Sequence, residues 1–171
     1  LKEIHEQPES LANTLRGRLL VAAGDVRLGG LTGMMAKLRR VKRCQIIACG
    51  TAAYAGRVGE YMLEEHAGIP TEVDIASEYR YRNPIVDSHT AFIFISQSGE
   101  TGDTLAALEE VKRQGGLTLG IVNTVGSSIA RATEAGVYNH AGPEIGVAST
   151  KAFTSQLAVL VGCPSGEGQF D

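Results

Sequence analysis

The stretch Ala91-Phe92-Ile93-Phe94-Ile95-Ser96-Gln97-Ser98-Gly99-Glu100-Thr101 joins an apolar run directly to a loop of hydroxyl, amide and glycine residues. As a strand, residues 91–95 would be apolar on both faces, which is typical of a strand covered by helices on both sides of a sheet. Apolar residues then recur at helical spacing over Gly102–Arg113. The stretch therefore predicts a buried strand, a polar loop and a helix in succession.

The same alternation continues on both sides of this stretch. Strands that alternate with helices at this pitch form a parallel sheet with right-handed crossovers. We therefore expect an α/β fold, a flavodoxin-like, doubly wound parallel sheet of five strands. The expected strands are Gln45–Cys49, Glu72–Ile75, Ala91–Ile95, Thr118–Val122 and the weaker Gly136–His140, and the expected helices include Ala52–His66 and Gly102–Arg113.

The two ends of the chain differ from this pattern. An N-terminal helix is interrupted at Pro8, where a new helix should begin. A glycine-containing stretch, Ala22–Gly33, and a short basic helix over Thr32–Val41 follow. Near the C-terminus, Gly162 and Pro164 should end the last helix. We expect three segments: an N-terminal helical arm (1–41), the α/β domain (42–162) and a disordered or unrelated tail (163–171).

Composition excludes several classes of function. The chain has 171 residues, with 16 basic and 19 acidic side chains and a net charge of −3, which argues against a nucleic-acid partner. No apolar run reaches the roughly 18 residues of a membrane span, and no export signal opens the sequence. The 3 cysteines and 4 histidines lack metal-ligand spacing, so we expect no metal, no other cofactor and a cytoplasmic location.

Polar loops follow four of the predicted strands, and such sheets bind ligands beyond the carboxyl ends of their strands. The loop Ser96–Thr101 offers three hydroxyls, one amide and one glycine immediately before a helix. Unpaired N–H groups and the partial positive charge of a helix N-terminus suit a phosphate group. Alternatively, the hydroxyls only cap the helix. Asp103 counts against phosphate because it adds a negative charge to the first turn.

Other phosphate and hydrolase motifs are absent from the sequence. It contains no G-x-x-x-x-G-K-[ST] loop and no G-x-G-x-x-G after a strand, which disfavours nucleotides. G-x-S-x-G is also missing, so Ser98 is a poor candidate for a hydrolase nucleophile. The loop is best suited to a monophosphate held without metal or nucleotide.

Four motifs in order resemble the first SIS (sugar isomerase) domain of the glutamine–fructose-6-phosphate aminotransferase family, over most of residues 2–161. The resemblance implies a SIS fold and a phosphosugar partner. In the family, a glutaminase domain and two SIS domains make glucosamine 6-phosphate from fructose 6-phosphate and glutamine. The motifs are Cys49-Gly50-Thr51, Glu72–Arg82, Ser96–Thr101 and Glu144–Thr154.

The resemblance also implies which residues contact the sugar phosphate. One of them departs from the family, because Ala52 stands where many members have serine. Tyr79–Arg82 is expected to form a packed surface helix or a subunit contact rather than a surface that stacks on bases. The implied substrate contacts are Thr51, Ala52, Ser96, Gln97, Ser98, Thr101, Val147 and Ser149.

The resemblance places the family's acid/base residues in the second SIS domain, so no catalytic residue is expected here. We expect a fragment that binds the phosphosugar without converting it and that pairs as a homodimer. Glu144 and Lys151 are more easily explained by structural roles. Two alternatives stay open: a stand-alone SIS regulator, and a different ketose–aldose isomerase that would use His140 and Glu144.

Overall fold

The computed structural model describes residues 1–163 of the chain. Its main sheet has five parallel strands in the order β4-β3-β5-β6-β7, which is the flavodoxin-like order 2-1-3-4-5. The predicted doubly wound α/β fold is therefore confirmed. The strands are β3 (Arg43–Ala48), β4 (Thr71–Ile75), β5 (Thr90–Ser96), β6 (Leu117–Val122) and β7 (Ala135–Tyr138).

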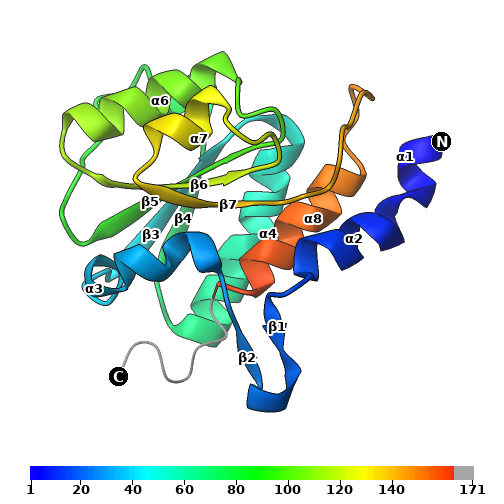
Figure 1. The fold of residues 1–171 in the computed structure, drawn as a ribbon. Helices are drawn as coiled ribbons and strands as arrows, with labels where there is room; N and C mark the ends of the chain where they lie inside the picture. Colours follow the sequence, from blue (N-terminus) through cyan, green and yellow to red (C-terminus); the bar gives the residue numbers. More distant parts are fainter. Residues whose placement is uncertain (164–171) are drawn as a thin grey trace.

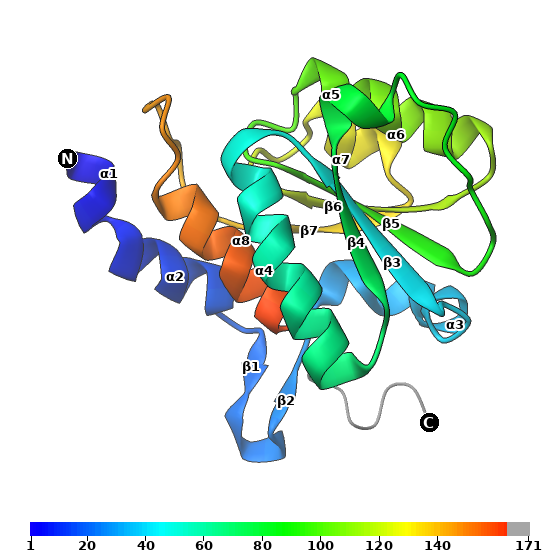
Figure 2. The same cartoon turned by 180° about the vertical axis from the view of Figure 1, so that it is seen from behind.

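Helices cover both faces of this sheet (Figures 1 and 2). Two long helices, α4 (Gly50–Ala67) and α8 (Lys151–Val161), lie on one face. Three helices, α5 (Ala76–Tyr79), α6 (Gly102–Arg113) and α7 (Ser128–Ala132), lie on the other. The arrangement is the three-layer sandwich that a fully buried parallel sheet requires.

The side chains of β5 show why this strand is central. Ile93 and Ile95 pack into the core on the side of α4 and α8. Phe92 and Phe94 pack into the other core, with α6 and α7. All of them are buried, so an apolar run without alternation is explained by the two helical layers. The helix that follows, α6, spans the residues that the sequence predicts.

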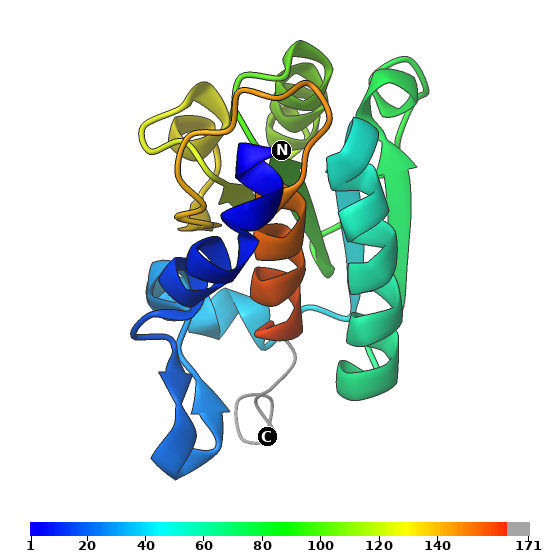
Figure 3. The same cartoon turned by 90° about the vertical axis from the view of Figure 1, so that its right-hand side faces the viewer.

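The N-terminal arm begins with two helices separated at Glu6, α1 (Lys2–His5) and α2 (Gln7–Leu15). Pro8 lies in the first turn of α2, as predicted, where its missing N–H has no cost. Helix α2 lies against α8, as Figure 3 shows from the side. The Ser10 hydroxyl is 2.7 Å from that of Ser155, so a buried hydrogen bond joins the two helices.

The rest of the arm differs from the prediction. The chain after α2 forms a small antiparallel hairpin of two strands, β1 (Leu19–Leu20) and β2 (Asp25–Val26). The 3₁₀ turn η1 (Val21–Ala23) joins these strands, so the hairpin extends into the glycine-containing stretch Ala22–Gly33. The predicted basic helix over 32–41 is only partly right, because its first residues belong to a 3₁₀ helix, η2 (Gly29–Met34), and the α-helix that follows, α3 (Met35–Leu38), has only one turn.

Glycines explain this difference in part. Gly29, Gly30 and Gly33 disfavour a regular α-helix. A Cβ on Gly30 would lie 1.9 Å from the carbonyl oxygen of Gly136, so the segment passes directly over β7 and needs a residue without a side chain. Of the predicted tail, Cys163 is partly buried against the core, and the remaining residues, 164–171, lie outside the described part of the chain.

Candidate functional site

A pocket of about 160 Å³ lies at the carboxyl ends of the strands. It is formed by the residues that follow β3, the loop that follows β5, and the segment that leads into α8. The structure brings all eight residues implied by the resemblance to this one pocket, although they come from three separate parts of the chain. They are Thr51, Ala52, Ser96, Gln97, Ser98, Thr101, Val147 and Ser149.

Hydrogen bonds fix the hydroxyls of the loop after β5. The buried Ser96 Oγ accepts a hydrogen bond from the Gly99 N–H at 3.0 Å and lies 2.9 Å from Thr101 Oγ1. Ser98 Oγ accepts one from the Glu100 N–H at 3.1 Å. These contacts preorganise the hydroxyls, and each oxygen keeps further hydrogen-bonding capacity.

Gly99 is required by the shape of this loop. Its φ is +68°, which side chains of L-residues rarely adopt. An added Cβ would also lie 2.0 Å from Ser127 Oγ. The backbone can therefore turn tightly beneath the pocket only because this position carries no side chain.

Two helices begin at the pocket with uncapped N-termini. Thr101 is the N-cap residue of α6, but its side chain makes no capping hydrogen bond and lies against Ser96 instead. Cys49, the N-cap residue of α4, makes none either. The first N–H groups of both helices are thus without a side-chain acceptor, which is the arrangement that favours an anion. Helix capping alone does not explain the hydroxyls of this loop.

The negative charge of Asp103 is compensated. Its carboxylate accepts a hydrogen bond from the Arg80 guanidinium at 2.8 Å. Arg80 directly follows α5, whose Tyr79 is fully buried. The predicted surface helix over Tyr79–Arg82 is only partly right, because α5 ends at Tyr79 and the next two residues form a turn. Asp103 therefore opposes an anion at the N-terminus of α6 less than its position in the sequence suggests.

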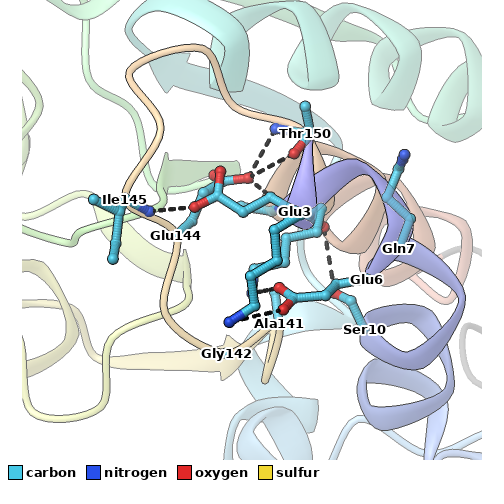
Figure 4. A network of polar contacts seen from close by, with 12 residues as sticks. Glu3, Glu6, Gln7, Ser10, Ala141, Gly142, Glu144, Ile145 and Thr150 are labelled. Carbon is cyan, nitrogen blue, oxygen red and sulfur yellow. Dashed lines mark hydrogen bonds and ion pairs between the residues drawn. The ribbon is translucent and has the colours of Figure 1, made fainter.

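Glu144 and Lys151 have structural contacts, as expected. The Glu144 carboxylate accepts hydrogen bonds from the Ser149 hydroxyl at 2.9 Å and from the N–H groups of Thr150 and Ala152 at 2.8 and 3.3 Å. It thereby caps the N-terminus of α8. Lys151 is 6% exposed at its side chain and forms an ion pair with Glu6, with 2.7 Å between Nζ and Oε2. Figure 4 shows these contacts around the segment that precedes α8.

The pocket also contains residues that the sequence did not indicate, and Gln156 is the most informative of them. Its side chain is buried, and its Oε1 has no hydrogen-bond partner within residues 1–163. A buried acceptor without a donor is costly unless a ligand supplies one. Nothing in the sequence of α8 distinguishes this amide from a packing residue. Besides Glu144, which the sequence already marks as a candidate for the alternative isomerase, the further lining residues are Cys49, Ile95, Gly146 and Gln156.

Two larger cavities lie next to this pocket. One, of about 540 Å³, is lined on one side by the start of the arm and on the other by residues 141–143, 145 and 146. The other, of about 620 Å³, is open and includes Gln97, Ser98 and His140. Partial burial and the nearby Arg18 charge lower the pKa of His140, which favours its neutral form.

Two other kinds of site are not found in the described part of the chain, a metal cluster and a membrane-spanning helix. Within residues 1–163, no group of three or more His, Cys, Asp and Glu side chains could hold a metal ion. No helix described by the structure has the length and apolar character needed to cross a bilayer.

Comparison with known proteins identifies the family. The SIS domain family matches residues 37–161. The chain is 58% identical over 160 residues to glutamine–fructose-6-phosphate aminotransferase of Chlorobaculum tepidum and 56% identical to that of Thermus thermophilus. Each match covers 94% of this chain and 26% of the relative, so the chain spans about a quarter of the relatives' length.

A solved structure shows the same fold. The C-terminal domain of glucosamine-fructose-6-phosphate aminotransferase from Francisella tularensis superimposes with a TM-score of 0.86 at 42% sequence identity. The match covers 93% of this chain and 44% of that chain. The chain therefore belongs to the SIS domain family, and its sequence matches the SIS region of the glutamine–fructose-6-phosphate aminotransferases.

Proposed function

We propose that the chain is the phosphosugar-binding SIS domain of a glutamine–fructose-6-phosphate aminotransferase and binds fructose 6-phosphate and glucosamine 6-phosphate in the pocket above β5. The observation that carries this proposal is the convergence on one pocket of the eight residues that the resemblance implies, from three separate parts of the chain. The uncapped N-termini of α4 and α6 support a phosphate there, since both direct free N–H groups toward it.

The hydroxyls support a sugar phosphate in a second way. A phosphate dianion needs several donors, and Ser96, Ser98 and Thr101 place three hydroxyls next to the start of α6. Ser149 and Gln156 also line the pocket, where their hydroxyl and amide can contact sugar hydroxyls.

Titration of the purified chain with glucosamine 6-phosphate tests the proposal. We expect saturable binding that inorganic phosphate competes away. Ser98→Ala should weaken it by about 1–3 kcal/mol, because a hydrogen bond to a charged group is lost. Ser88→Ala is the matched control, since Ser88 is exposed and lies outside the pocket. Equal affinities of the two variants would contradict the proposed site.

We further propose that the chain alone does not isomerise the sugar. Glu144 is the only carboxylate that lines the described pocket, and four hydrogen bonds from residues 149–152 already occupy it. The isomerising aminotransferase activity thus belongs to the whole protein in this proposal. In this proposal the isolated chain binds fructose 6-phosphate, but only the whole protein converts it with glutamine as the second substrate.

One observation favours an alternative, a ketose–aldose isomerase. His140 and Glu144 both line the open cavity that includes Ser98. Exchange between fructose 6-phosphate and glucose 6-phosphate by the isolated chain would support it, provided that His140→Asn abolished the exchange.

The predicted homodimer and cytoplasmic location also remain proposals, and sedimentation velocity of the chain would test the pairing.

A further inference from the structure

The segment that leads into α8 has no regular structure, although it carries two of the proposed sugar contacts. Residues 141–150 form neither helix nor strand. Ile145 is 91% exposed, and Val147 is fully exposed, so apolar packing does little to fix their positions. The conformation that brings Val147 and Ser149 to the pocket must therefore come from polar contacts.

Glu3 provides such contacts in the middle of the segment. Its Oε1 accepts hydrogen bonds from the N–H groups of Ile145 at 2.6 Å and Gly146 at 3.2 Å, and its Oε2 lies 3.3 Å from the same Gly146 nitrogen (Figure 4). These two backbone donors lower the pKa of the Glu3 carboxyl, so it is ionised at neutral pH. The contact spans 142 positions of sequence.

Gly146 is shaped for this carboxylate. A Cβ at this position would lie 2.7 Å from Glu3 Oε2, so a side chain here would displace the acid. Gly146 also lines the proposed sugar pocket. Gly146 therefore both contacts the arm and forms part of the pocket wall.

Glu6 holds the end of the segment. Its carboxylate pairs with Lys151, whose side chain is almost completely buried at the start of α8. A buried ammonium without a partner is strongly unfavourable. The carboxylates of the arm thus contact this part of the chain at two places, through Glu3 at residues 145–146 and through Glu6 at residue 151.

The arm is held in place independently of these carboxylates. Ser10 and Ser155 form a buried hydrogen bond between α2 and α8. The Thr14 hydroxyl donates to the Asn139 carbonyl at 2.6 Å, just beyond β7. Because α2 is fixed to the domain in this way, α1 can serve as a support for the segment rather than being carried by it.

We propose that Glu3 and Glu6 are positioning residues for phosphosugar binding, because they hold residues 144–151 in the conformation that completes the pocket. This inference rests on the proposed function. Glu3 carries its test, because its removal leaves no buried charge, whereas loss of Glu6 leaves Lys151 unpaired and endangers the fold.

The first measurement is hydrogen exchange of the segment. In Glu3→Ala, we expect the N–H groups of Ile145 and Gly146 to exchange faster by about tenfold or more, because their acceptor is lost. Glu9→Gln is the matched control, since Glu9 is an exposed acid in the same arm, whereas the N–H groups of Ile145 and Gly146 donate to Glu3 and not to Glu9 in the described structure. Its exchange rates should equal those of the unmodified chain.

The second measurement is the affinity for glucosamine 6-phosphate. We expect Glu3→Ala to raise the Kd by about fivefold or more, Glu3→Gln to raise it less because an amide oxygen can still accept one bond, and Glu9→Gln to leave it unchanged. The melting temperature of Glu3→Ala should fall only slightly, because hydrogen bonds of a partly exposed carboxylate contribute little to stability. A purely structural role would lower it more and would not produce this graded effect on affinity.

The outcomes separate the two proposals. If the unmodified chain binds the sugar phosphate and Glu3→Ala binds equally well, the positioning role is overturned and the proposed function stands. If the unmodified chain does not bind at all, both are overturned. Faster exchange at residues 145–146 together with the graded loss of affinity supports the inference.

Discussion

At Gly99, a single missing side chain allows the loop after β5 to form. The positive φ would cost an alanine about 1–2 kcal/mol. The contact with Ser127 Oγ would add roughly 1–3 kcal/mol of overpacking. We therefore expect Gly99→Ala to lower the free energy of unfolding by more than the backbone strain alone, as measured by urea denaturation.

Gly126→Ala separates the two contributions to this loss. Gly126 also has a positive φ, of +72°, but an added Cβ would meet nothing within 4 Å. It should therefore show the strain without the collision. If both variants lost equal stability, the close approach of Gly99 to Ser127 would contribute nothing to the destabilisation by Gly99→Ala.

Gln156 leads to a prediction of the opposite kind. Because its buried Oε1 has no hydrogen-bond donor among residues 1–163, replacing the amide by leucine should leave the stability unchanged or raise it slightly. The same change should weaken binding of glucosamine 6-phosphate by about 1 kcal/mol or more. Thermal unfolding and calorimetric titration of Gln156→Leu measure the two effects. A loss of stability without a loss of affinity would show that the amide is a packing residue.

At the scale of elements, the N-terminus of α6 depends on its partner α5. Arg80 neutralises Asp103 in the first turn of α6. Arg80→Met removes the guanidinium and leaves the Asp103 carboxylate unpaired near the proposed site of the sugar phosphate. The Kd for glucosamine 6-phosphate should then rise modestly, within about threefold, because the side chains of Arg80 and Asp103 are both partly exposed. Asp103→Asn in the same chain should restore the affinity. Titrations at low and high salt would show the difference shrinking as salt screens it.

The elements that could be predicted from the sequence are those with a strong local signal. The continuous apolar run of β5 and the apolar residues at helical spacing in α6 are both long enough to be recognised in the sequence. The hairpin β1–β2 escapes prediction because its strands have two residues each and too few positions to show alternation. Helix α7 has only five residues, too few for a periodic pattern.

The site was predictable to the extent that loops after parallel strands converge. That rule and the resemblance together indicate residues as distant as Thr51 and Ser149, and the structure brings them to one pocket. The contribution of Glu3 was not predictable, because its acceptor role depends on how α2 seats α1 against residues 145–146. Such a contact has no signature in either segment taken alone.

At the scale of the whole molecule, acidic side chains make stability depend on pH. Hydrogen bonds and ion pairs in the folded chain lower the pKa of five carboxyls, whereas burial raises that of Glu60. A lowered pKa stabilises the fold above the unfolded value, and this contribution is lost as pH falls through the folded value. The carboxyls with lowered pKa are Glu3, Glu6, Asp87, Glu100 and Glu110.

The urea midpoint should therefore fall in two steps as the solution is acidified. The first begins near pH 6.5, the ordinary pKa of histidine, because His140 has a lowered pKa and the unfolded chain takes up its proton first. The second begins near pH 4 to 5, where the five carboxyls start to protonate in the unfolded chain. His140→Asn should remove only the first step, since asparagine tolerates the positive φ of 57° at this position and does not titrate. Glu3→Gln should reduce only the second step, and a midpoint that stayed level between pH 7 and pH 3 would contradict both assignments.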